Sequence, residues 1–279
     1  MDRGFRMLGA GVALMLAQAA AQAAVAPDVV QALAHKSGLW GQMDSLGGQV
    51  RAGMAGAMSQ GTNAPGEAVR SRLLGCADTA YGADAMRATA LDAVGGALRP
   101  DDVPALVAWF DSALGAKVAS QEQAVAAQAI DPAERMRRGD EALRAASVQR
   151  KASLQAIITE THSVAIMADT AIEMAAAVRQ GLASADPSAT PEAIANIKAD
   201  LASRRPQIVA RYTQISLPAY AFAYAGLNDD ELKRYADYLA TPAAQAYRDG
   251  SERGVARALA DGSTRLARCL KDAGAAKAP

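Results

Sequence analysis

Two stretches of this sequence follow one pattern: LRPDDVPALVAWFDSALGAK at residues 98–117 and, 129 positions later, LNDDELKRYADYLATPAAQA at residues 227–246. Each begins with acidic residues, which suit the positive end of a helix dipole, and continues with apolar or aromatic residues at helical spacing. Ser112 and Thr241 then offer a hydroxyl that can cap a following helix. Each copy is therefore predicted to form a short helix, a tight capped corner and a second helix. The shared caps and aromatics indicate an internal duplication, and chance similarity between two alanine-rich helices is the alternative.

The rest of the chain also carries helix signals. Apolar residues recur every three or four positions, as in the stripe Met43, Leu46, Val50, Met54 and Met58, which predicts a buried helix face. A flexible methionine surface for a ligand is the alternative there. No stretch alternates as a strand would, and only 4% of the residues are aromatic. We therefore expect an all-α fold of duplicated helical units, as a pseudo-two-fold bundle or a helical repeat, with no sheet.

The two copies suggest how the chain is divided. We expect a first helical unit at residues 27–140, a second at 141–272, and a disordered, alanine-rich tail at 273–279. Apolar spacing from Leu154 to Val178 predicts one long helix in the second unit.

The first 26 residues have the character of an export signal. Arg3 and Arg6 form a positive segment, an uncharged apolar stretch follows, and small residues then match a cleavage site near Ala23. A short membrane anchor is the alternative, but the apolar run is well below the ~20 residues that span a bilayer. We expect a protein of the periplasm, or a secreted one, with no integral membrane segment after cleavage.

The expected location predicts the oxidation state of the two cysteines. An even pair in an oxidising compartment usually forms a disulfide, so we expect a bond between Cys76 and Cys269. Two unlinked, buried thiols are the alternative.

An acidic cap, a short helix ending in two aromatics, a Ser-Pro-Leu-Gly corner and a basic residue make up a motif that residues 98–117 carry, with Ala113 in place of the proline. Residues 227–246 form a diverged copy that keeps the proline and lacks Leu-Gly. This pattern resembles a bacterial envelope family, the domain of unknown function 2059. The resemblance implies an exported all-α module, often built of helical repeats, and implies no activity. The matching residues are Asp102, Ser112, Leu114, Gly115, Lys117, Glu231, Thr241 and Pro242.

Charge and motifs exclude several functions. The 29 Lys and Arg balance 29 Asp and Glu, which leaves no basic excess for binding nucleic acid. No common zinc, nucleophile-elbow or thiol motif is present. The acidic clusters 101–102 and 229–231 suit a cation, but their equivalent positions in the two copies favour helix capping. We expect no metal site, no cofactor and no catalytic residue.

A non-enzymatic role follows as the main hypothesis: binding of an envelope protein or a small apolar ligand between the two units. Trp109, Phe110, Tyr235 and Tyr238 are the predicted contacts, although packing between helices is a simpler role for them. A hydrolase that uses His162 with a nearby carboxylate is one alternative. A structural part of an envelope complex is another, and a homo-oligomer is compatible with either.

Overall fold

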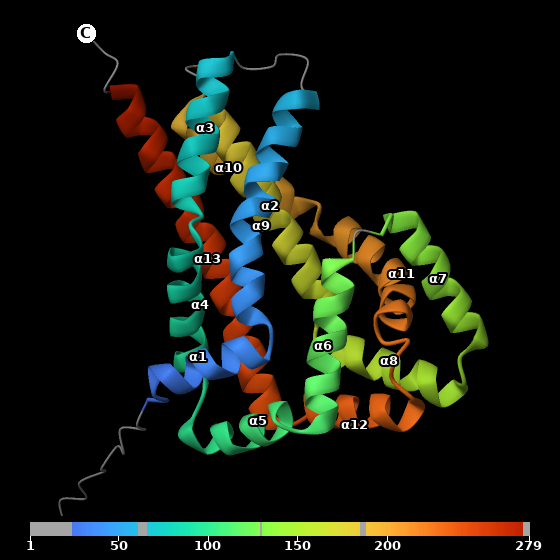
Figure 1. The fold of residues 1–279 in the computed structure, drawn as a ribbon. Helices are drawn as coiled ribbons and strands as arrows, with labels where there is room; N and C mark the ends of the chain where they lie inside the picture. The colour runs from blue at the N-terminus through green and yellow to red at the C-terminus, as the bar shows by residue number, and fades with distance from the viewer. Residues whose placement is uncertain (1–23, 61–65, 129, 185–187, 276–279) are drawn as a thin grey trace, which may run out of the picture.

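The computed structural model describes residues 24–60, 66–128, 130–184 and 188–275, and the predicted signal cleavage site lies outside them. Within these ranges all regular elements are helices and no strand is formed, which confirms the all-α class (Figure 1). None of the described helices combines the length and apolar character needed to cross a bilayer. The helices are α1 (Pro27–Lys36), α2 (Leu39–Gln60), α3 (Glu67–Ala80), α4 (Ala83–Ala97), the 3-10 helix η1 (Pro100–Asp102), α5 (Val103–Phe110), α6 (Ala113–Ala127), α7 (Pro132–Ala145), α8 (Val148–Glu160), α9 (Ser163–Ser184), α10 (Pro191–Ser203), α11 (Arg205–Ala223), α12 (Asp229–Leu239) and α13 (Pro242–Ala275).

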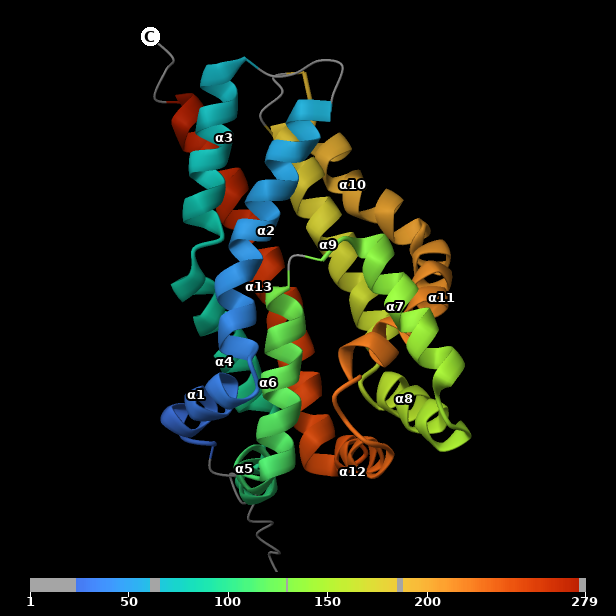
Figure 2. The ribbon, with the colours of Figure 1, turned by 45° about the vertical axis from the view of Figure 1, so that its right-hand side comes forward.

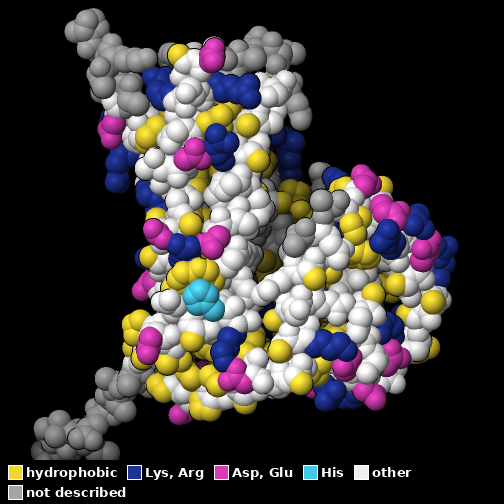
Figure 3. Space-filling view, in the orientation of Figure 1, with side chains coloured by type: hydrophobic (Ala, Val, Ile, Leu, Met, Phe, Trp, Pro, Cys, Tyr) yellow, Lys and Arg dark blue, Asp and Glu magenta, His cyan; other side chains and the backbone are white. Residues whose placement is uncertain are grey.

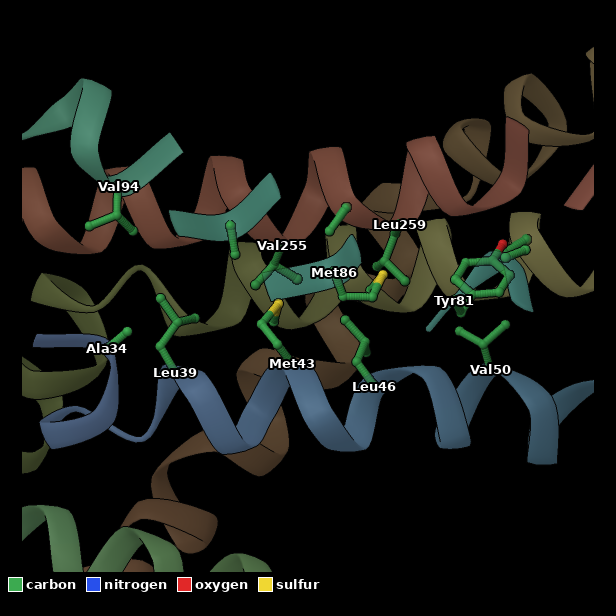
Figure 4. Packing of buried hydrophobic residues seen from close by; sticks show 14 of the residues in the cluster. Ala34, Leu39, Met43, Leu46, Val50, Tyr81, Met86, Val94, Val255 and Leu259 are labelled. Carbon is green, nitrogen blue, oxygen red and sulfur yellow. The ribbon is translucent and has the colours of Figure 1, made fainter. Parts of the chain in front are cut away.

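A tall bundle of α1 to α4, α9 and α13 encloses the larger hydrophobic core (Figure 1). Met43, Met54 and Met58 of α2 are no more than 3% exposed, so the methionines fill this core as predicted. Met43 and Leu46 point from α2 toward Leu259 of α13 (Figure 4). The apolar stripe of α2 is thus one wall of the larger core.

Small residues let α13 approach α4 and α3 closely. A Cβ added at Gly254 would stand 2.8 Å from the Cα of Ala90, and one added at Gly262 would stand 2.3 Å from the ring of Tyr81. Any larger side chain would therefore collide with backbone or a buried ring. The small residues recur every fourth position, at Gly250, Gly254, Ala258 and Gly262.

A disulfide joins α3 to the last turns of α13. Cys76 and Cys269 are bonded, with their Cα atoms 5.7 Å apart, a distance typical of disulfides. The predicted bond is confirmed, and it ties together positions that are 193 residues apart in the sequence.

A lobe beside the bundle holds the smaller core, which α6, α7, α8, α11 and α12 build (Figure 2). Leu154 and Ile157 of α8 are fully buried there, and Tyr224 and Tyr235 are largely buried beside them. The long helix α9 contacts α2 and α13 on one side and α10 and α11 on the other, so it connects the bundle to the lobe.

The two cores are not consecutive segments of the chain. The last helix, α13, packs on α3 and α4 in the larger core, whereas α6 and α7 pack on α11 and α12 in the lobe. Residue 140, the expected end of the first unit, lies within α7. The expected tail also differs in part, because α13 continues through residues 273–275.

The long helix expected from Leu154 to Val178 is two helices. The chain turns between α8 and α9 at Thr161 and His162, and His162 has a φ of +47°, in the left-handed region. Thr161 donates its hydroxyl to the carbonyl of Ile157, which closes the end of α8. The apolar spacing continues across the turn because both helices contribute to the interior, so the spacing alone hides the break.

Candidate functional site

The acidic residues of both stretches close the starts of short helices. The carboxylate of Asp102 accepts the backbone N–H of Arg99 at 2.9 Å, and that of Glu231 accepts the backbone N–H of Asn228 at 2.9 Å. The Arg99 side chain also donates to Asp102 and lowers its pKa. Lys117 donates to both oxygens of Glu231 at 2.8 and 2.7 Å. Capping therefore accounts for these residues, and no metal-binding cluster is found among the described residues.

Two capped corners follow these short helices. Ser112 accepts the backbone N–H of Gly115 at 2.9 Å, and Thr241 accepts that of Ala244 at 3.3 Å. Each hydroxyl also donates to the carbonyl three residues earlier, at 2.7 Å in both corners. A Cβ at Gly115 would stand 2.1 Å from the Trp109 carbonyl oxygen, so only glycine fits the first corner. The predicted order of short helix, capped corner and second helix is confirmed in both stretches.

The corners bring their aromatic residues together. The rings of Trp109 and Tyr238, which occupy equivalent positions in the two stretches, stack with centroids 4.0 Å apart and planes 6° apart. Tyr235 lies nearly parallel to Trp109 at 5.7 Å, and Phe110 meets Tyr247 of α13 edge-on at 5.9 Å. Residues 129 positions apart thus form one aromatic cluster between the bundle and the lobe.

A cavity of about 130 Å³ lies in this cluster, and we call it the corner cavity. All four predicted ligand contacts line it, so the structure brings together residues that the sequence only associates by pattern. Its lining residues are Ser37, Trp109, Phe110, Gly115, Val118, Ala119, Glu122, Tyr235, Tyr238, Leu239, Ala244, Tyr247 and Arg248.

Glu122 of α6 is the acidic group of the corner cavity. One of its carboxylate oxygens, Oε1, accepts the hydroxyls of Tyr224 at 2.6 Å and Tyr235 at 3.0 Å. Burial raises the pKa of Glu122, and the two hydroxyl donors oppose that shift only in part. Burial also raises the pKa values of both tyrosines, which therefore stay neutral around it.

Sequence reasoning missed Glu122. It stands between two glutamines in a stretch that reads as a polar helix surface. The helical spacing does place Glu122 on the inner face of α6. Leu114, Val118 and Glu122 are four residues apart and share one face, which packs on α12.

The basic residue of the corner cavity is already paired. Arg248 forms ion pairs with Asp249 and Glu252, and its guanidinium donates to the backbone carbonyl of Glu160. Ser37, the only aliphatic hydroxyl of the lining, shares a hydrogen bond with the Tyr247 hydroxyl at 2.6 Å. The Ser37 hydroxyl is thus bonded to a phenol and to backbone groups, and not to a carboxylate or an imidazole.

A larger hollow of about 470 Å³ lies between α7, α8 and α11. Asp140, Leu143, Arg144, Lys151 and Leu217 line it, without an aromatic ring. Its charged residues are exposed to solvent. We therefore place the candidate site in the corner cavity, where aromatic groups and the half-buried carboxylate of Glu122 converge.

His162 has no catalytic surroundings. His162 is exposed to solvent, and its imidazole makes no hydrogen bond or ion pair with the described residues. Asp169, one of the carboxylates near His162 in the sequence, forms a bidentate contact with Arg205 at 2.6 and 3.0 Å. The neighbouring Ser163 hydroxyl donates to a backbone carbonyl. This geometry gives the hydrolase hypothesis no support.

The surface carries charges of both signs. On the face drawn in Figure 3, basic and acidic side chains are interspersed over the bundle and the lobe. Many are paired, such as Lys36 with Asp111 and Arg87 with Asp44. This face offers no continuous basic surface of the kind that follows a phosphate backbone.

No protein-family model matches the chain, and neither does any curated protein or solved structure. The resemblance to the domain of unknown function 2059 accordingly stays a prediction, and the functional argument rests on the geometry of the corner cavity.

Proposed function

We propose that the protein is an exported, non-enzymatic binding module of the cell envelope that holds a small ligand in the corner cavity. The observation that carries this proposal is the convergence of aromatic residues from both stretches, with the Glu122 carboxylate, around one small cavity. Ligand sites commonly combine such an apolar lining with a few polar groups that fix orientation.

The size of the corner cavity limits the ligand. A buried apolar cavity of about 150 Å³ can hold a benzene molecule. At about 130 Å³, the corner cavity suits a molecule with a handful of heavy atoms rather than a lipid or a peptide. A partner protein would have to bind elsewhere on the surface.

Two features support export. The first 26 residues carry the charge and apolar pattern of a signal peptide. The bond between Cys76 and Cys269 belongs to an oxidising compartment, since cytosolic thiols are mostly kept reduced. Fractionation of the host cell with amino-terminal sequencing tests this part, and we expect a periplasmic or secreted chain that begins near residue 24.

A cavity-filling variant tests the binding role. Ala119→Leu places a larger side chain in the cavity lining, whereas Ala116→Leu makes the same change on an exposed position of α6. Native mass spectrometry of protein purified from its host should show a small bound mass in the wild type and in Ala116→Leu. The mass should be lost in Ala119→Leu.

The proposal fails if no bound mass is found and no small probe changes the thermal unfolding of the wild type. Suitable probes are phenol, choline and 3,3-dimethylbutan-1-ol. A stable complex with an envelope protein, unaffected by Ala119→Leu, would favour the structural role instead.

A further inference from the structure

The charge of the ligand follows from the groups around Glu122, given the ligand-binding role proposed above. We infer that the corner cavity selects a small organic cation, an amine or a quaternary ammonium, and that Glu122 is its counter-ion. The inference concerns the chemistry of the occupant, so it can fail while the cavity remains a binding site.

Glu122 lacks a cationic partner among the described residues. Its two hydrogen-bond donors, Tyr224 and Tyr235, are neutral hydroxyls, and both donate to Oε1. No described group donates to Oε2. A positive charge would stabilise this partly desolvated carboxylate, and no described donor occupies its Oε2 atom.

The other charged groups near the corner cavity are compensated. The positive charge of Arg248 is offset by Asp249 and Glu252. On the outer side of the corners, Lys117 is bound to Glu231. Ionised Glu122 therefore leaves the cavity with an unbalanced negative charge, which an anion would worsen and a cation would neutralise.

The aromatic walls of the cavity also favour a positively charged ligand. Trp109, Phe110, Tyr235, Tyr238 and Tyr247 line it, and aromatic rings attract cations through their quadrupoles, more strongly where water is excluded. Aromatic walls and one carboxylate are the groups by which proteins bind ammonium ligands. Methyl groups on the nitrogen would fill the apolar part of the space.

Choline and 3,3-dimethylbutan-1-ol form a matched pair of probes, because they share one shape and differ only in the charge of the central atom. We would titrate each into the full, disulfide-bonded protein by isothermal calorimetry at neutral pH. We expect choline to bind at least about tenfold more tightly, the scale of one charge-assisted contact.

Two variants assign the selectivity to Glu122. Glu122→Gln keeps an oxygen that can accept the tyrosine hydroxyls but removes the charge, and should bring the two probes within about twofold of each other. Glu67→Gln removes one negative charge from an exposed position on α3 and should keep the wild-type preference. Circular dichroism of both variants checks that they are folded.

The outcomes separate the two proposals. Equal affinities, or tighter binding of the neutral probe, would overturn the inference while leaving the cavity a binding site. Preference for choline that persists in Glu122→Gln would also overturn it. If neither probe nor phenol binds, the inference fails, and the binding role fails with it when the protein purified from its host also carries no bound mass.

Discussion

The larger and smaller cores are both made of packed helices, but different interactions hold them together. In the larger core, α13 lies against α4 through glycine contacts, and a disulfide fixes its end. In the smaller core, two tyrosine hydroxyls donate to one carboxylate oxygen of Glu122, and aromatic rings line a cavity beside it. The larger core has the features of a stabilising scaffold, whereas the smaller core and its corner carry a group that is costly to bury. The ligand-binding role proposed above would account for this division, because functional sites often keep locally unfavourable arrangements.

Breaking the disulfide should have the largest effect on stability, and it should weaken the larger core more than the smaller one. The double variant Cys76→Ala with Cys269→Ala should lose about 2–5 kcal/mol of unfolding free energy, because the bond restricts a long loop in the unfolded chain. Chemical denaturation measures that loss. Hydrogen exchange should increase first in α3 and the end of α13, while α8 and α12 keep their protection. An equal increase in both cores would contradict the comparison.

Substituting one of the closely packed glycines of α13 should have the next largest effect on stability. Gly254→Ala brings a methyl group against the backbone of Ala90, which no rotamer change can relieve, so we expect a loss of about 1–3 kcal/mol. Gly48→Ala is the matched control, because no atom lies within 4 Å of the added Cβ. This variant should gain about 0.5–1 kcal/mol from reduced chain entropy. Equal changes in stability at Gly254 and Gly48 would contradict the close packing of α13 on α4.

Removing the charge of Glu122 should stabilise the ligand-free protein at high pH. The pKa of Glu122 is raised by burial, so the folded state holds its proton more tightly than the unfolded state does. Its contribution to stability is therefore largest at low pH and is lost as the pH rises from about 4.5, the unfolded value, through the raised pKa. Tyr220, Tyr224 and Tyr235 face it and stay neutral in this range, because burial raises the pKa of each.

Glu122→Gln should abolish that decline. By pH 8 the variant should exceed the wild type by on the order of 1 kcal/mol in unfolding free energy. Denaturation curves between pH 4 and 8 test it, and parallel pH profiles for the two proteins would refute it. A variant that is more stable but no longer selects a cation would sharpen the contrast between the two cores.

The ion pair between Lys117 and Glu231 should contribute least to the stability of the protein. Lys117→Ala removes the partner of Glu231 but leaves its cap on Asn228, so we expect a small destabilisation at neutral pH. Lys117 lowers the pKa of Glu231, so the effect should fade as the pH falls and Glu231 is protonated. It should also fade in ~1 M salt. Thermal unfolding measures both, and a loss as large as that of Gly254→Ala would contradict this ranking.

Local features were predictable from the sequence because their causes are local. The caps at Ser112 and Thr241 need only a hydroxyl before a helix, and both form as expected. The methionine stripe of α2 follows from helical periodicity. The disulfide needed one further step, from an export signal to an oxidising compartment, but no knowledge of the fold.

Features that depend on distant segments were not predicted. The division at residue 140 assumed that neighbours in sequence pack together, whereas α13 packs with α4. Glu122 resembles a surface residue until α12 is placed against it. The turn at His162 lies inside an unbroken apolar pattern. The small residues of α13 recur every fourth position in the sequence, but that spacing does not say which helix they pack against.

The position of α13 also determines the order in which the molecule can fold. A chain that emerges from its amino-terminal end presents α1 to α4 first, yet the core that these helices share is completed only by the last helix. Contacts between such distant segments form slowly, because a long loop must close before they contribute any stability. The bond between Cys76 and Cys269 can therefore form only after the last helix has been made. A chain that still lacks α13 therefore has neither a complete larger core nor the bond that fixes its end.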